Sequence, residues 1–155
     1  MDLPFDEIKE IKFSRKRVPI PPEMRPIYRI SQIILILHLS STKQTASLLK
    51  LQLFNWGLQN EDRYERLLKL KETSYFPIIS FDPFLNRALN FGVTMGVFLF
   101  NDKTGKFSLT EKGEVLAHSI IKEDVFLEEK KFLKTIKKSL SDTYILKLFK
   151  ERYSS

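Results

Sequence analysis

The chain carries few side chains that could catalyse a reaction. It has no cysteine and only two histidines, His38 and His118, and no second metal ligand or nucleophile stands near either of them in the sequence. Metal centres and nucleophilic sites need several such groups at defined spacings. We therefore assign a structural role to both histidines.

Carboxylate and phosphate chemistry have equally little support in the sequence. Glu128 and Glu129 form an adjacent pair on an ordinary charged helix face, and no carboxylate cluster suggests a metal-dependent nuclease. The string KTGK at residues 103–106 lacks the glycine spacing of a phosphate-binding loop. We expect the chain to have no catalytic residue, no metal and no cofactor.

Basic side chains are a stronger functional signal, because the formal net charge is +7. Four of them lie within residues 12–17, and a lysine-rich face opposes an apolar face in residues 125–140. Affinity for the phosphates of DNA rises with the number of cations that contact them. The candidate DNA contacts are Lys12, Arg15, Lys16, Arg17, Lys130, Lys134, Lys137 and Lys138. The alternative is that both sets are solvated faces that bind nothing.

Sequence-specific reading of DNA is the less favoured hypothesis. A recognition helix needs side chains that reach base edges, typically Arg, Asn or Gln. Residues 45–59 would be that helix, and the polar side chains that they offer among bulky apolar groups are Gln52, Asn55 and Gln59. In the segment NDKTGK at residues 101–106, Lys103 and Lys106 could touch phosphates, but Asp102 offsets one of them.

Protein binding fits residues 45–59 better, because this segment carries two apolar stripes. One stripe comprises Leu49, Leu53 and Trp56, and the other comprises Leu51, Phe54 and Leu58. A step of two residues turns a helix by about 200°, so the stripes face nearly opposite ways. A small domain can bury one such stripe, whereas the second needs another layer or another protein.

The candidate partner-binding surface takes residues from both stripes and from the helix predicted over residues 141–149, and the sequence leaves open which stripe faces outward. Large aromatic side chains often dominate interface energies, which favours Phe54 and Trp56 as anchors. The candidate partner-binding residues are Leu51, Phe54, Trp56, Leu58, Ile145, Leu148 and Phe149. The open alternative is that the chain's own N-terminal arm or tail helices cover the second stripe.

The elements that would position these residues are mostly helical. Apolar periodicity predicts helices over residues 28–40, 45–59, 60–72, 125–140 and 141–149. Asp82 followed by Pro83 is a strong start signal for a further helix, whose inward residues we expect to be Phe84, Ala88, Phe91 and Met95. The runs VFLF and FSL, joined by NDKTGK, predict a β-hairpin, and Thr110 caps the helix after it.

Helix, hairpin and helix after a helical cluster is the order of a winged helix. We therefore expect a mainly α fold with a small β-hairpin: a winged helix-turn-helix domain with a C-terminal helical extension. The expected boundaries are a proline-rich basic arm at residues 1–26, the winged-helix domain at 27–122 and the extension at 123–155. A chain of 155 residues is long enough for one core.

The sequence also favours a cytoplasmic protein. Acidic residues stand where a signal peptide would need a basic start, and cysteine is absent. The longest apolar run, IILILHL at residues 33–39, is far shorter than the roughly 20 residues that cross a bilayer.

Three segments make the chain resemble a known family. LLKLQLFNWGLQNEDRYERLLKL, FDPFLNRALNFGVTMGVF and FSLTEKGEVLA together resemble the small middle component of bacterial three-component ABC-ATPase systems, the group that includes Lamassu defence. The resemblance covers roughly residues 25–122. Its most specific part is LxLFNWxL, formed by Leu51, Leu53, Phe54, Asn55, Trp56 and Leu58.

This resemblance implies a non-catalytic subunit bound to a large SMC- or Rad50-like ATPase, alongside an effector subunit that is often a nuclease, in a complex that senses phage or plasmid DNA. We therefore expect an accessory subunit that bridges ATPase and effector, with nonspecific contact to double-stranded DNA as a lesser hypothesis. The alternative is a winged-helix transcriptional regulator. A regulator should bind a short duplex alone with sequence preference, whereas a subunit should bind weakly and with steep salt dependence, or not at all.

Overall fold

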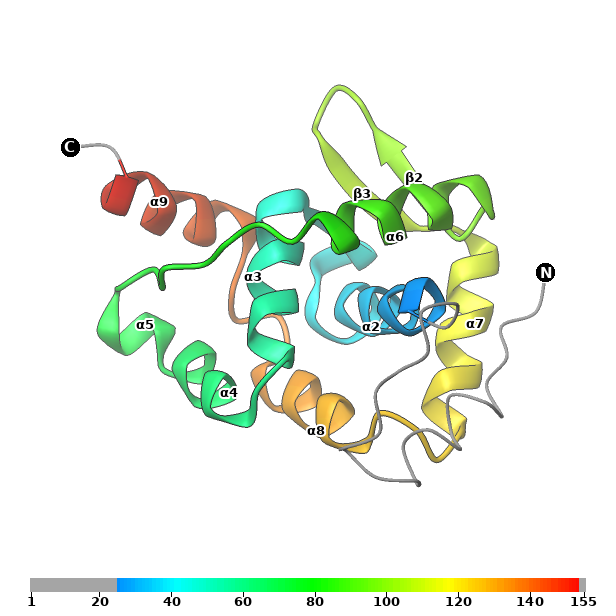
Figure 1. The fold of residues 1–155 in the computed structure, drawn as a ribbon, viewed down its shortest axis with the longest axis horizontal. Helices are drawn as coiled ribbons and strands as arrows, with labels where there is room; N and C mark the ends of the chain where they lie inside the picture. The colour runs from blue at the N-terminus through cyan, green and yellow to red at the C-terminus, as the bar shows by residue number, and fades with distance from the viewer. Residues whose placement is uncertain (1–24, 154–155) are drawn as a thin grey trace.

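The computed structural model describes residues 25–153 (Figure 1). This part of the chain is mainly helical and includes a small three-stranded antiparallel sheet, which confirms the predicted class. The elements are α2 (Arg25–Ser40), η2 (Thr42–Gln44), β1 (Thr45–Ser47), α3 (Leu48–Leu58), α4 (Glu61–Leu68), α5 (Leu70–Thr73), α6 (Pro83–Thr94), β2 (Phe98–Asn101), β3 (Lys106–Leu109), α7 (Glu111–Lys122), α8 (Leu127–Ile136) and α9 (Asp142–Tyr153).

The predicted hairpin is present, and a strand from elsewhere completes the sheet. β2 and β3 pair antiparallel, with Phe100 opposite Phe107. β1 pairs with the other edge of β3, with Ala46 opposite Phe107, so the strand order is β1-β3-β2. Residues 45–47 were expected to begin a helix. Instead α3 begins after them, because the Ser47 side chain accepts a hydrogen bond from the Lys50 backbone N–H and caps the helix.

Helix α2 forms the centre of the core. Its residues 30–37 are buried, and α6, α7 and α8 all pack against it. The helix predicted over residues 28–40 is thus confirmed. None of the helices in the described part of the chain is both long and apolar enough to span a bilayer.

Helix α3 is buried on every side, which corrects the predicted partner-binding surface. Leu51 and Phe54 have no exposed area, and Trp56 and Leu58 are also buried. Helices α4 and α9 pack on α3, and the Phe54 ring lies 6.5 Å from Phe132 of α8. The chain therefore supplies the second layer itself, which is the alternative that the sequence left open.

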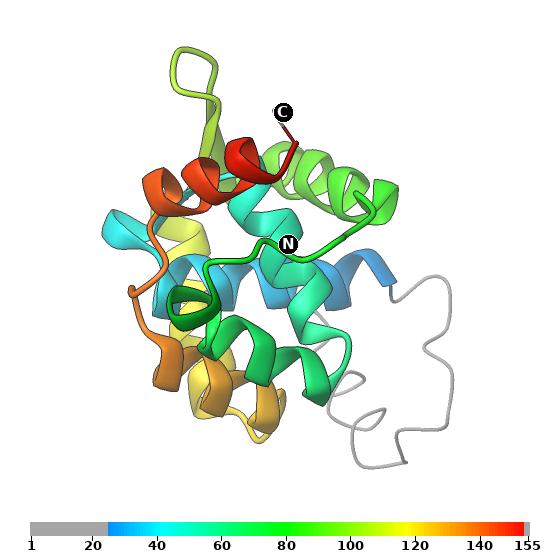
Figure 2. The same ribbon diagram turned by 90° about the vertical axis from the view of Figure 1, so that its left-hand side faces the viewer.

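The other half of the predicted partner surface is also internal. Ile145 and Leu148 of α9 are buried, and Phe149 is half-buried with its ring 5.4 Å from Phe76. Asp142, at the start of α9, accepts hydrogen bonds from the Ser47 backbone N–H and hydroxyl at 2.9 and 2.8 Å. The tail helices thus share one core with the rest of the described chain (Figure 2).

Candidate nucleic-acid interface

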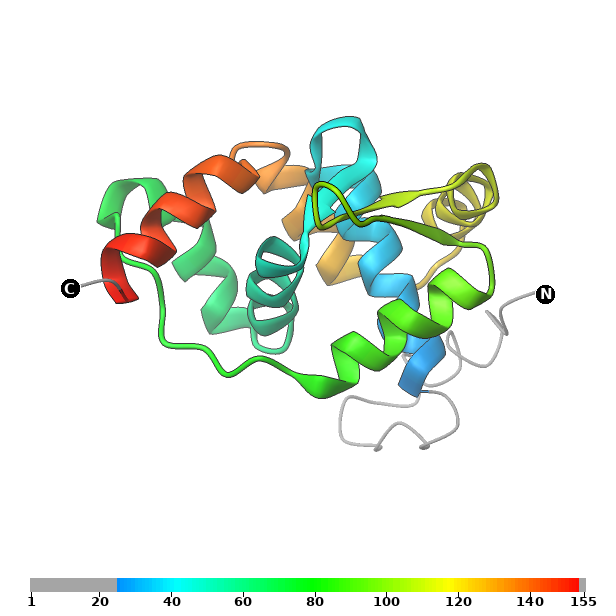
Figure 3. The ribbon, with the colours of Figure 1, turned by 90° about the horizontal axis from the view of Figure 1, so that it is seen from above.

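The helix that directly precedes the hairpin is α6, and not the segment tested as a recognition helix from the sequence. Helix α3 lies in the interior, while α6 runs along the surface beside the β2–β3 hairpin (Figure 3). Residues 48–58 therefore offer no exposed face to a nucleic acid. The polar side chains of residues 45–59 have a different role.

Two of those polar side chains position the start of α6. Gln52 and Asn55 are buried. The Gln52 amide accepts a hydrogen bond from the Asp82 backbone N–H at 2.9 Å and donates one to the Asp82 carbonyl at 3.2 Å. Asn55 donates to the Asp82 carboxylate at 3.3 Å. These amides hold the chain entering α6 and do not face a ligand. Gln59 is exposed at the end of α3.

Asp82 itself caps α6, as predicted. Its carboxylate accepts a hydrogen bond from the Phe84 backbone N–H at 2.9 Å. It also forms an ion pair with Arg29 of α2, at 2.7 Å. Burial alone would raise the pKa of Asp82, but the Phe84 hydrogen bond and the Arg29 charge outweigh burial and lower it. The start of α6 is therefore fixed to both α2 and α3.

The inner face of α6 brings the helix close to the hairpin. Leu85, Ala88, Leu89 and Gly92 are buried. A Cβ atom at Gly92 would lie 2.3 Å from the Phe98 ring, so only glycine allows this approach of α6 to β2. Phe84 and Phe91, predicted to point inward, are exposed instead, and Met95 is half-buried. The true inner face is rotated from the predicted one by about a quarter turn.

The outer face of α6 presents polar side chains suited to nucleic acid. Arg87, Asn90 and Thr94 lie three and four residues apart, so they share one face, and none of them is buried. Arg and Asn are the side chains that most often read guanine and adenine edges. The exposed rings of Phe84 and Phe91 flank this row, and the Arg87 guanidinium lies 5.2 Å from the Phe84 ring centre.

The hairpin turn projects away from the helices and carries two lysines (Figures 1 and 2). The Asn101 side chain accepts a hydrogen bond from the Lys103 backbone N–H at 2.9 Å, and Gly105 has a φ of +70°. Lys103 is exposed, whereas Lys106 pairs with Asp142 at 3.5 Å. Lys103 is therefore the freer of the two for a phosphate.

The base of the hairpin is held by the start of α7. Thr110 caps α7 as predicted, because its hydroxyl oxygen accepts a hydrogen bond from the Gly113 backbone N–H. The same hydroxyl donates to the Gly96 carbonyl at 2.5 Å and lies 3.1 Å from the Val97 carbonyl oxygen. A Cβ atom at Gly113 would lie 2.4 Å from that carbonyl oxygen. Helix α6, the hairpin and α7 thus meet at one corner.

The predicted DNA contacts have mixed outcomes. Lys12, Arg15, Lys16 and Arg17 lie outside the described residues. Lys130 is buried, with 5% of its area exposed, and its ammonium donates to the Glu123 carbonyl at 2.7 Å, so it cannot reach a phosphate. Lys134, Lys137 and Lys138 are exposed, but α8 lies on the opposite side of the molecule from the hairpin turn (Figure 1).

The two histidines come together at the end of α2 and on α7. Their rings lie 5.2 Å apart, edge to face. His38 is hydrogen-bonded to the Gln44 side chain at 2.8 Å. Sequence spacing gave no indication of this contact, because the two residues are eighty positions apart.

Comparisons of the chain with models of protein families, with curated proteins and with solved structures found no match. The resemblance noted in the sequence therefore stays a prediction.

Proposed function

We propose that this chain is a winged-helix protein that contacts double-stranded DNA through α6 and the β2–β3 turn. The order helix, strand, helix, helix and hairpin, with β3 between β1 and β2, supports a winged helix in which α4 and α5 are inserted before the third helix. The observation that carries the proposal is the row of Arg87, Asn90 and Thr94 on the outer face of the helix next to the hairpin.

Charge reversal at this face tests the proposal. We expect Arg87→Glu combined with Lys103→Glu to weaken binding of the full chain to a 20-bp duplex at least tenfold, since a good Arg contact to a base is worth about 1–3 kcal/mol. Fluorescence anisotropy at two salt concentrations measures the affinity and its salt dependence. Loss of the Lys103 contact should also lower the slope of the logarithm of the binding constant against the logarithm of the salt concentration by about one, the value for one phosphate contact.

The matched control is Lys134→Glu with Lys137→Glu, which changes the net charge equally on the α8 side. Both residues are exposed, and they belong to the lysine face that the sequence favoured. The control should retain most of the affinity. Equal losses in the two variants would mean that the chain responds only to net charge, and the α6 interface would be rejected.

A second candidate function is the accessory subunit of an SMC- or Rad50-like ATPase complex in anti-phage or anti-plasmid defence, bridging the ATPase and an effector. A specific observation favours a protein partner. The connector between α5 and α6 and the first turn of α6 expose a row of large apolar side chains, which comprises Tyr75, Ile78, Phe81 and Phe84. Ile78 is 72% exposed. Contact with DNA does not need such a row, whereas protein interfaces are rich in aromatic and aliphatic anchors.

Co-purification tests this second function. We expect the tagged chain to retain a large ATPase encoded by a neighbouring gene after nuclease treatment, and Ile78→Asp with Phe81→Asp to abolish that retention. Val115→Asp with Leu146→Asp, two exposed apolar residues on α7 and α9, is the control and should retain the ATPase. Recovery of no ATPase by the unmodified chain would reject the subunit function and leave DNA binding untouched.

A further inference from the structure

The packing of α2 on α7 brings the two histidines of the chain to one place. His38 lies in the last turn of α2, and His118 lies within α7. The two helices pack against each other, and the histidine rings have their centres 5.2 Å apart with an angle of 70° between the ring planes. Imidazole nitrogens suit Zn²⁺, Ni²⁺ and Cu²⁺ as ligands. Because the chain has only these two histidines, this is where such an ion would meet two imidazoles.

Gln44 determines which nitrogen of His38 can bind a metal ion. The Gln44 amide oxygen lies 2.8 Å from Nδ1 of His38. An amide oxygen only accepts hydrogen bonds, so Nδ1 carries a proton and Nε2 of the neutral ring keeps its lone pair. Histidines that bind metals commonly donate their other ring nitrogen to an oxygen in this way, which fixes the tautomer and the ring orientation. The His38 ring is therefore held in the tautomer that a metal ion at Nε2 requires.

The separation of the rings suits one ion shared between them. Two imidazoles that bind a tetrahedral ion at about 2.0–2.1 Å have their ring centres roughly 5 Å apart. The His118 side chain is 60% exposed, so rotation about its side-chain bonds can turn a nitrogen toward the ion without disturbing the core. Glu114, one turn earlier on α7, lies 3.9 Å from Nε2 of His118 and places a negative charge beside the pair.

The histidine pair differs from a structural zinc site in the number of its protein ligands. Within residues 25–153, no group of three or more His, Cys, Asp or Glu side chains is placed to hold a metal ion. A structural zinc site has four protein ligands and is closed to solvent, whereas open positions are filled by water. Two histidines therefore predict an ion that exchanges readily with solution and that a chelator removes.

We propose that His38 and His118 together bind one divalent metal ion that favours imidazole, such as Zn²⁺ or Ni²⁺, with water in the remaining positions. His38 binds through Nε2, and His118 binds through one of its ring nitrogens. The bound ion joins the end of α2 to α7 and so stabilises the contact between the two helices. The proposal does not depend on the DNA interface at α6, because it concerns different residues and a different ligand.

Titration of the full chain, without a histidine tag, with Zn²⁺ or Ni²⁺ tests the proposal. Isothermal titration calorimetry should give about one ion per chain, and the ion should raise the unfolding temperature because it binds the folded state. We expect His38→Gln and His118→Gln each to lower the affinity at least tenfold, since even the loss of a residue that only orients a ligand typically costs that much. Neither variant should gain stability when the ion is added.

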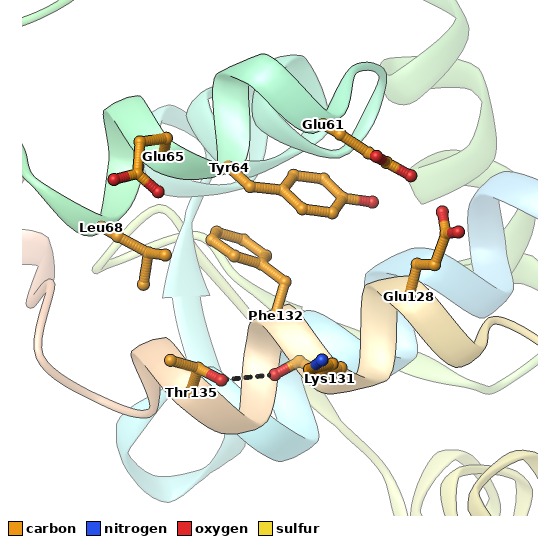
Figure 4. Close-up of a pocket in the computed structure, with 8 residues that line it drawn as sticks. All are labelled: Glu61, Tyr64, Glu65, Leu68, Glu128, Lys131, Phe132 and Thr135. Carbon is orange, nitrogen blue, oxygen red and sulfur yellow. Dashed lines mark hydrogen bonds between the residues drawn. The ribbon is translucent and has the colours of Figure 1, made fainter.

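The groove of about 430 Å³ between α4 and α8 supplies the matched control (Figure 4). Glu61 and Glu128 line this groove and approach each other across one end of it. Carboxylate oxygens suit Mg²⁺, whereas imidazole suits Zn²⁺ and Ni²⁺. We expect Glu61→Gln/Glu128→Gln to bind Zn²⁺ as tightly as the unmodified chain does, and Mg²⁺ not to compete for the histidine site. Loss of Zn²⁺ binding in this control would place the ion at the carboxylates and overturn the proposal.

A measurement on the unmodified chain guards against misfolding of the histidine variants. Proton–nitrogen NMR spectra of the imidazoles need no substitution, and Zn²⁺ should shift the signals of both rings together. A shift of one ring alone, two ions per chain, or full affinity in either histidine variant would overturn the proposal. Half an ion per chain with formation of dimers would also overturn it, since the ion would then join two copies of the chain.

Discussion

Replacing Phe54 with alanine is expected to lower the free energy of unfolding by about 3–5 kcal/mol. The Phe54 side chain has no exposed area and lies where α3 meets α8, with the Phe132 ring 6.5 Å away. Removal of the ring leaves a cavity, and the packed helices around it can collapse only partly to fill it. Chemical denaturation of the full chain, followed by circular dichroism, measures the loss.

The matched control for this prediction is Phe81→Ala. Phe81 is 47% exposed in the connector before α6, and we expect its loss to cost less than about 1 kcal/mol. The comparison also separates the two hypotheses for α3. If Phe54→Ala were as stable as the unmodified chain, the Phe54 ring would not be core, and the partner surface predicted from the sequence would have to be reinstated.

Local sequence signals predicted the local features of the fold. The Asp82 and Thr110 caps were found in the sequence because a capping side chain bonds to a backbone N–H only two or three residues away. The β2–β3 hairpin was found for the same reason, since its strands are joined by a short turn with Asn101 and Gly105.

Features that depend on distant contacts were not predictable in this way. β1 is three residues long and becomes a strand only because it pairs with Lys106–Leu109, about sixty residues further along the chain. The burial of α3 likewise depends on α9, which joins the sheet through Asp142 and Ser47. The two apolar stripes of α3 look the same in the sequence whether another protein or the C-terminal helices of the same chain cover the second stripe. The sequence of α3 alone therefore cannot distinguish an interface from a core helix.

The candidate interface was missed for a related reason. Gln52 and Asn55 are polar enough to suggest base-reading groups, yet both bind Asp82. Gln52 bonds to the Asp82 backbone, 30 residues further along the chain, and Asn55 bonds to the Asp82 carboxylate, 27 residues further along. The sequence does not single out Arg87 and Asn90, because the helical spacing of Phe84 and Phe91 predicts that those two rings form the inner face of α6, whereas both are exposed. The glycine at position 92 was the available signal, since it marks the face that touches β2.

Lys50 is a charged residue that neither the apolar periodicity nor the proposed function explains. It is 2% exposed, its ammonium donates to the Ser40 carbonyl at 2.7 Å, and it lies 5.4 Å from the Phe54 ring centre. Burial lowers the pKa of Lys50 to about 8, although the nearby Asp142 carboxylate acts in the opposite direction. The ammonium is thus held in the core at neutral pH at a cost to stability.

Stability should therefore depend on pH through Lys50, with a defined sign. Between pH 8 and the ordinary lysine pKa of 10.5, the unfolded chain keeps a proton that the folded chain has lost, so the folded state gains stability as the pH rises. The full gain is about 3 kcal/mol, at about 1.4 kcal/mol for each unit of pKa shift. Below pH 7 both states are protonated, and the contribution is constant.

The comparison with Lys50→Met isolates this effect. Above pH 10 the raised pKa values of Tyr28 and Tyr64 act in the opposite direction, because the folded chain then holds protons that the unfolded chain loses. Both tyrosines remain in the variant, so they cancel in the difference. We expect the difference in the free energy of unfolding between the two chains to be constant from pH 5 to 7. Above pH 8 it should change in favour of the unmodified chain. A difference that stays flat to pH 10 would show that Lys50 has water access in the folded chain.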